Sequence, residues 1–80
     1  MQAVFSKGAV KAISGMDAST KARIRKGINA IPAGDIKKLQ GHTKLYRLRI
    51  GDWRIVFSYQ DVNTILVENI GPRGQIYKGV

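Results

Sequence analysis

Residues 45–59, LYRLRIGDWRIVFSY, decide the fold of this chain. Apolar and polar side chains alternate on both sides of a central Gly-Asp pair, which is the pattern of two strands joined by a two-residue turn. Gly51 takes the first central position of that turn, where a type II′ hairpin turn requires a positive φ. The sequence therefore predicts a β-hairpin whose register is set by Gly51 and Asp52.

The predicted register sorts the side chains of the hairpin onto two faces. Counting outward from the turn places Ile50 opposite Trp53 and Arg49 opposite Arg54. The other predicted pairs are Leu48 with Ile55, Arg47 with Val56 and Tyr46 with Phe57. Successive side chains of a strand point to opposite faces, so one face is apolar and the other is cationic. The apolar face holds Tyr46, Leu48, Ile50, Trp53, Ile55, Phe57 and Tyr59, and the cationic face holds Arg47, Arg49 and Arg54.

The predicted pairing of Arg49 with Arg54 is the most informative feature of the hairpin. Like charges directly opposite each other on neighbouring strands are destabilising. An anionic ligand turns this repulsion into attraction, and the guanidinium fork suits phosphate oxygens better than an ammonium group does. Alternatively, two solvated arginines splay apart into water at little cost. The pairing by itself leaves both interpretations open.

The net charge of the chain indicates the kind of partner it has. Its 80 residues suit one domain spanning residues 1–80, and 14 Lys and Arg against 5 Asp and Glu give a net charge of +9. Such an excess attracts nucleic acid or an acidic partner chain through long-range electrostatics. The short, Ala-rich helical segments lack the bulky apolar face that binding to a membrane surface needs.

Other functional classes find little support in the composition. The chain has no cysteine and one histidine, so we expect no disulfide, no metal site and no cofactor. No apolar run approaches the ~20 residues of a membrane span, and no signal segment opens the chain. We therefore expect a cytoplasmic protein without a membrane partner.

Two short helices are predicted before the hairpin. Ser6 can cap the first, which follows an apolar strand over residues 2–5 and stops at Gly15. Asp17 can cap the second, which Pro32 and Gly34 end. The apolar stripe of this second helix consists of Ile24, Ile28 and Ile31, and its solvent side carries Lys21, Arg23, Arg25 and Lys26. These four cations suit a solvated helical face better than a nucleic-acid contact.

The rest of the chain completes an α+β fold. Residues 35–44 are expected to form a connector, in which His42 is interpreted as a surface residue rather than a catalytic acid or base. Residues 64–70 predict a last strand, which Gly71-Pro72 breaks. The order of elements predicts two N-terminal helices packed on one face of a mostly antiparallel sheet of about four strands.

Taken in order, these segments resemble the RelE/ParE superfamily of type II toxin–antitoxin toxins, and specifically the RelE-like mRNA interferases that act on the ribosome. The resemblance covers nearly the whole chain and rests on the order and spacing of several motifs. These are residues 4–7, VFSK; residues 36–41, IKKLQG; the hairpin over residues 45–57; and residues 70–73, IGPR, with Tyr77 four positions later. A small RelE-like domain is the implied fold.

The resemblance also implies a set of site residues. RelE-like toxins use two basic side chains before the turn, an arginine after it, an arginine that ends the last strand, and a nearby tyrosine. By motif position these are Arg47, Arg49, Arg54, Arg73 and Tyr77. The lysines of residues 35–44, Lys37, Lys38 and Lys44, are expected to bind RNA as well. Many relatives carry lysine where this chain has Arg47 and Arg49. Because arginine does not give up its proton, the identity of the general base stays open.

The implied activity is metal-independent cleavage of mRNA by attack of a 2′-hydroxyl on its own phosphate. The implied partners are a cognate antitoxin, the ribosome with its mRNA, and operator DNA, the last only as a toxin–antitoxin complex. A ParE-like inhibitor of DNA gyrase shares the fold without a nuclease site and is the alternative. A third possibility is an inactive member that only helps its antitoxin to bind DNA.

Overall fold

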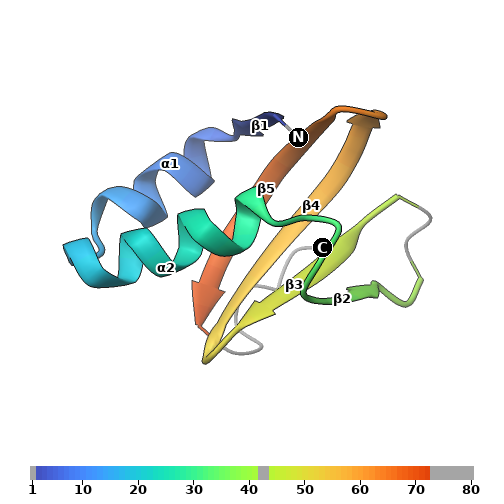
Figure 1. Cartoon of the computed structure of the whole chain (residues 1–80). Helices are drawn as coiled ribbons and strands as arrows, with labels where there is room; N and C mark the ends of the chain where they lie inside the picture. Colours follow the sequence, from blue (N-terminus) through green and yellow to red (C-terminus); the bar gives the residue numbers. More distant parts are fainter. Residues whose placement is uncertain (1, 42–43, 73–80) are drawn as a thin grey trace.

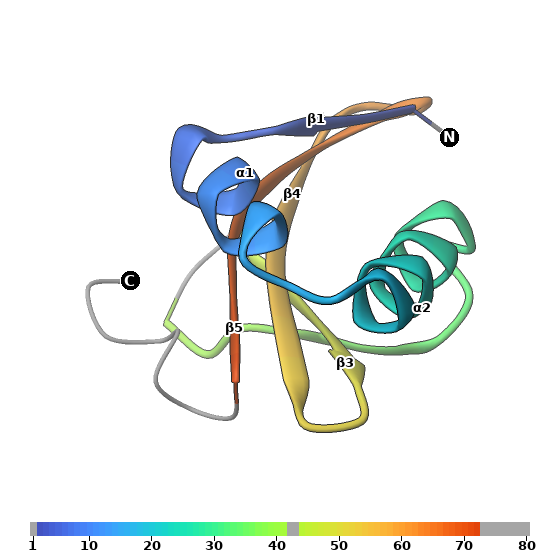
Figure 2. The ribbon, with the colours of Figure 1, turned by 90° about the vertical axis from the view of Figure 1, so that its left-hand side faces the viewer.

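The computed structural model describes residues 2–41 and 44–72, which form two helices on one face of a five-stranded sheet. In chain order the elements are β1 (Gln2–Phe5), α1 (Lys7–Ser14), α2 (Ala18–Asn29), β2 (Asp35–Lys38), β3 (Tyr46–Ile50), β4 (Trp53–Asp61) and β5 (Thr64–Pro72). The strand order is β1-β5-β4-β3-β2, with β1 parallel to β5 and the other pairs antiparallel. Figures 1 and 2 show both helices on the same side of the sheet. No helix in the described part of the chain is long and apolar enough to span a membrane.

The register of the central hairpin is the one that the sequence predicts. All five pairs between β3 and β4 occur, including Arg49 opposite Arg54. Gly51 has a φ of 59°, the positive value that its place in the turn requires. The apolar face of the hairpin packs against the helices, and Leu48, Ile55 and Phe57 are buried there. The cationic face therefore points away from the helices.

Both predicted helix caps are present. The Ser6 hydroxyl accepts a hydrogen bond from the Ala9 amide at 3.1 Å, and the Asp17 carboxylate accepts one from the Thr20 amide at 2.7 Å. Hydrogen bonds from the Thr20 side chain and backbone lower the pKa of Asp17 below its usual value. The second helix ends at Asn29, before the predicted stop at Pro32, and Ile31 is buried in the turn that follows.

The predicted connector over residues 35–44 is wrong in its first part, because residues 35–38 form β2. This strand pairs with β3 along its whole length and brings the sheet to five strands, where about four were expected. Its sequence, DIKK, has three charged residues in four and resembles a loop. Short, lysine-rich strands are common at sheet edges, where they oppose pairing with another chain.

The last strand also runs further than predicted. Gly71 and Pro72 do not break β5 but extend it, opposite Arg54 and Trp53 of β4. Proline is tolerated at the end of a strand, where its missing amide costs no hydrogen bond of the ladder. The extension places a residue without a side chain directly beside Arg54.

Candidate functional site

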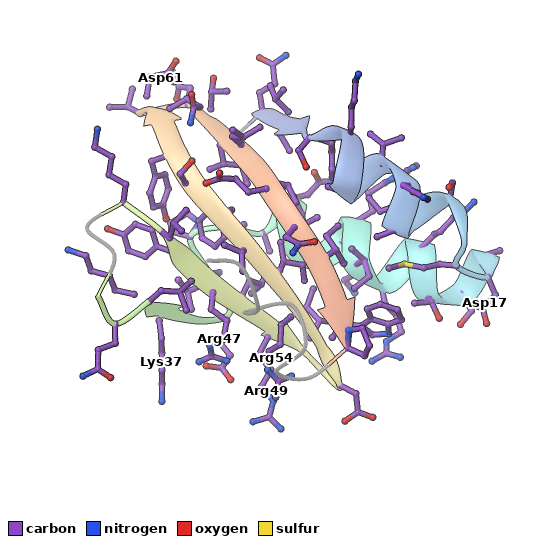
Figure 3. All side chains as sticks on the ribbon, turned by 180° about the vertical axis from the view of Figure 1, so that it is seen from behind. Asp17, Lys37, Arg47, Arg49, Arg54 and Asp61 are labelled. Carbon is purple, nitrogen blue, oxygen red and sulfur yellow. The ribbon has the colours of Figure 1, made fainter. Side chains whose placement is uncertain are left out.

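Basic side chains from three strands gather on the face of the sheet that the helices leave uncovered. Arg47 and Arg49 come from β3, Arg54 comes from β4, and Lys37 comes from β2, where it pairs with Arg47. Figure 3 shows these four side chains along one side of the sheet, with Asp61 at the opposite end. The structure thus brings together the cationic face and one of the three predicted RNA-binding lysines.

The remaining predicted residues lie elsewhere. Lys38 pairs with Tyr46 and therefore belongs to the other face of the sheet, and Lys44 is exposed just before β3. Arg73 and Tyr77 lie outside the described residues, as does His42.

Arg49 and Arg54 converge on one backbone oxygen. Arg49 donates through Nε to the Gly51 carbonyl at 3.4 Å, and Arg54 donates through Nη1 to the same oxygen at 3.1 Å. Arg54 Nη1 also donates to the Trp53 carbonyl at 3.3 Å. Partial negative charge on these oxygens offsets some of the repulsion between the guanidinium groups. No ion pair to either arginine forms within the described segments, so no carboxylate there competes with an anionic ligand for direct contact with these two groups.

Arg47 is held differently from its two neighbours. Its side chain is only 13% exposed, and its Nη2 lies 3.5 Å from the Asp35 carboxylate of β2. Asp35 pairs with Arg49 in the sheet, so its carboxylate reaches Arg47 diagonally across the two strands. A weakly exposed guanidinium with a carboxylate partner is a fixed anchor, whereas Arg49 and Arg54 have backbone oxygens as their acceptors among the described residues.

Asp35 is the site residue that the sequence analysis missed. It stands in a segment expected to be a connector, and only its pairing with β3 puts it on the cationic face. The sequence does place this acid two positions before Lys37, and residues at that spacing share a face of a strand. The spacing is informative only once residues 35–38 are known to form a strand.

The side chains on this face favour phosphate binding over metal binding. In the described part of the chain no three His, Cys, Asp or Glu residues gather closely enough to hold a metal ion. Guanidinium groups offer several donors in a plane and match the oxygens of a phosphate. The arrangement can therefore hold a phosphodiester and stabilise added negative charge on it.

A second feature is a groove of about 320 Å³ between the two helices. Its floor is apolar and includes Phe5, Ile24 and Ile28, while Lys21 and Arg25 of α2 also line it. The neighbouring Val10 of α1 is 54% exposed. An apolar floor beside two cations suits an amphipathic segment with acidic residues.

Comparison with known proteins identifies the fold. No protein-family model and no curated protein matches the chain. Among solved structures, a chain of the RelB–RelE antitoxin–toxin complex from Methanococcus jannaschii matches with a TM-score of 0.74 and 27% identity, covering 94% of this chain and 95% of that one. The RelE–RelB complex from Pyrococcus horikoshii matches with a TM-score of 0.68 and 27% identity, over 92% and 96% of the two chains.

The isolated RelE toxin of E. coli shares the fold alone, with a TM-score of 0.70 and 18% identity over 96% of this chain and 90% of that one. The match therefore extends beyond the archaeal complexes to a toxin without its antitoxin. This chain therefore has a RelE-like fold and is similar to the RelE toxins of these structures.

Proposed function

We propose that this chain cleaves mRNA in the translating ribosome and is held inactive by a cognate antitoxin. One observation carries the proposal. Arg49 and Arg54 stand opposite each other on the uncovered face of a RelE-like sheet, and neither has a carboxylate partner within the described residues. The fold alone does not need this repulsive pair, whereas a bound phosphodiester gives it a role.

The reaction that fits these residues is transfer within the RNA strand. The 2′-oxygen forms a bond to the adjacent phosphorus, the bond from phosphorus to the 5′-oxygen breaks, and the products are a 2′,3′-cyclic phosphate and a 5′-hydroxyl. One proton leaves the 2′-hydroxyl and one reaches the departing 5′-oxygen. A pentacoordinate phosphorane forms after the 2′-oxygen bonds to phosphorus and before the 5′-oxygen leaves. Negative charge grows on its non-bridging oxygens, and Arg49 and Arg54 are positioned to stabilise that charge.

The other proposed catalytic residues have supporting roles. Arg47, fixed by Asp35, holds the RNA backbone in register. By the family resemblance, Arg73 stabilises the developing negative charge or the leaving oxygen. Tyr77 stacks on a base or exchanges a proton. Lys37, Lys38 and Lys44 contribute RNA contacts. The ribosome supplies orientation of the strand, which can replace much of the acid–base catalysis that arginines cannot perform.

The partner that inhibits the toxin is an acidic antitoxin, partly disordered when free. The similar archaeal structures are antitoxin–toxin complexes, and this chain carries a net charge of +9. A segment that folds on binding can cover a large surface, and the groove between α1 and α2 suits an amphipathic helix with acidic residues. Operator DNA is bound only by the assembled pair, which acts in the cytoplasm.

Translation in a purified system tests the activity. We expect added protein to stop translation and to leave transcripts cut at defined positions inside the ribosome, with cyclic or 3′-phosphate ends. Because the arginines rather than a metal stabilise the phosphate, cleavage should persist in EDTA once polyamine replaces magnesium in holding the ribosome together. Arrest with intact transcripts would contradict the proposal.

The alternative is inhibition of DNA gyrase by contact, as for a ParE-like toxin. A contact inhibitor has no need for arginines that converge on a phosphate site, which is why cleavage is favoured. A supercoiling assay separates the two, because relaxed DNA accumulates only if gyrase is the target.

A further inference from the structure

One arginine from the opposite side of the sheet reaches the turn of the hairpin. Arg23 lies on the exposed side of α2, and its guanidinium is so close to Gly51 that a Cβ atom there would lie 2.7 Å from Nη2. The Gly51 carbonyl is also the acceptor for Arg49 and Arg54. Guanidinium groups from α2, β3 and β4 therefore surround a single residue.

A second glycine explains how Arg23 comes to be there. Gly27 lies one turn after Arg23 on the same side of α2. A Cβ atom at Gly27 would collide with the side chain of Ile50, so the absence of a side chain lets the helix approach β3 closely. Because Ile50 directly precedes the turn, this approach sets Arg23 against Gly51.

The turn has one acid, Asp52, and within the described residues no ion pair joins it to the guanidinium groups around it. The ion pair in this part of the structure joins Arg47 to Asp35, and none forms to Arg23, Arg49 or Arg54. After the hydrogen bonds from Thr20, the positive charge of Arg23 also helps to lower the pKa of Asp17, the N-cap of α2, but the Asp17 and Arg23 side chains do not form an ion pair. Three guanidinium groups beside the single carboxylate of Asp52 leave an excess of positive charge at the turn, which a ligand with several negative charges offsets.

We propose that Arg23 binds a second phosphate of the RNA strand whose reacting phosphate lies between Arg49 and Arg54. The strand then passes around the β3–β4 turn, from the cationic face to the exposed side of α2. This inference rests on the proposed function and extends its site to a helix that the sequence analysis interpreted as merely solvated. Arg23 positions the strand and does not touch the reacting atoms.

Binding of two probes of different length tests the role of Arg23. The long probe is a labelled strand of about ten 2′-O-methyl ribonucleotides, which cannot be cleaved because its 2′-oxygens are blocked. The short probe is a 2′-O-methyl dinucleotide with a single phosphodiester. We expect Arg23→Gln to weaken the long probe several-fold and to lower the slope of log affinity against log salt by about 0.7, as loss of one phosphate contact does.

The short probe separates the two kinds of contact. Arg23→Gln should leave binding of the dinucleotide unchanged, since its single phosphate occupies the Arg49–Arg54 position, whereas Arg54→Gln should weaken both probes. Arg23→Lys should keep most of the affinity for the long probe. Arg25→Gln is the matched control, because it removes the same charge from the same helix at the groove between α1 and α2.

Several outcomes would overturn the inference. Equal losses from Arg23→Gln and Arg25→Gln would show an effect of net charge alone. Loss of dinucleotide binding together with a lower melting temperature would show that Arg23 only supports the turn. A wild-type protein that does not bind the long probe also contradicts it.

The ribosome assay distinguishes this failure from failure of the proposed function. If wild-type protein binds the long probe through Arg23 but leaves ribosomal mRNA intact, the proposed reaction is disproved while the second phosphate site stands. If wild-type protein cleaves ribosomal mRNA and Arg23→Gln binds the long probe as tightly as wild type, the proposed reaction stands and the second phosphate site is disproved.

Discussion

At the scale of single residues, Arg54 is placed where the stability of the fold and the proposed activity make opposite demands. It faces Arg49 across the hairpin and, among the described residues, donates to two backbone oxygens. Arg54→Gln should leave the protein as stable or a few tenths of a kcal/mol more stable, with the gain shrinking as salt rises. The same change should slow cleavage ~10²-fold, because a preorganised charge near the phosphate is lost.

Thermal melts at two ionic strengths and a ribosome cleavage assay measure both effects of Arg54→Gln. A variant that melts several degrees lower would show that the guanidinium is mainly structural. A variant that cleaves at the parent rate would remove Arg54 from the site.

Asp35 gives a second prediction at this scale, because it is the acid that holds Arg47. Asp35→Asn leaves a guanidinium that is 13% exposed without its carboxylate, and we expect a loss of up to about 1 kcal/mol in the free energy of unfolding. It should also tighten binding of the long 2′-O-methyl probe, since a negative charge beside the cationic face is gone. Urea melts and probe titrations measure the two effects.

Asp61→Asn is the matched control for Asp35→Asn. It removes the same charge from the opposite end of the sheet and keeps an oxygen that can accept from the Asn63 amide (Figure 3). A similar gain in probe affinity from both variants would mean that Asp35 acts through net charge rather than through Arg47.

At the scale of elements, the β3–β4 hairpin depends on Gly51. Its φ of 59° is unfavourable for residues with a side chain, and a Cβ atom there would meet the guanidinium of Arg23. Gly51→Ala should therefore lower the free energy of unfolding by about 1–2 kcal/mol. Gly15→Ala is the control, because Gly15 caps α1 with a φ of −86° and a Cβ there would meet backbone oxygens only at ordinary contact distances of 3.8 and 4.0 Å. A Gly51→Ala variant as stable as Gly15→Ala would contradict the assigned turn.

The second helix gives a pH-dependent prediction. The pKa of Asp17 is lowered in the folded protein by hydrogen bonds from Thr20, so the ionised carboxylate stabilises the fold. That contribution is complete above the unfolded pKa, near 3.8, and is lost as the pH falls through the folded value. Asp17→Asn keeps a capping oxygen but does not titrate.

Unfolding free energies measured from pH 7 down to pH 2 test the Asp17 prediction. Wild-type protein should exceed Asp17→Asn in stability at neutral pH, and the difference should close below pH 3.8. A difference that is independent of pH would assign the effect to the geometry of the cap instead.

At the scale of the whole molecule, the proposed toxin activity of this chain, which carries a net charge of +9, should harm a cell that lacks the proposed antitoxin. We expect expression of this chain alone to arrest growth, and expression of a variant with both Arg49→Gln and Arg54→Gln at equal level to be tolerated. Growth curves with immunoblots of protein level measure this. Normal growth with abundant wild-type protein would count strongly against a toxin.

The sequence by itself determined the features that depend on near neighbours in the chain. The Gly-Asp turn and the alternation of apolar with polar residues predict the register of β3 and β4, including the opposition of Arg49 and Arg54. Ser6 and Asp17 likewise predict their helix caps, because a cap involves residues only three positions apart.

Only the tertiary structure decided the features that depend on pairing between distant segments. Residues 35–38 form a strand because β3 offers them hydrogen bonds, and β5 continues through Gly71 and Pro72 because β4 lies beside it. The position of Arg23 depends on the close approach of α2 to β3 at Gly27. Local sequence encodes periodicity and turn chemistry, whereas these contacts are set by which surfaces pack together once the chain has folded.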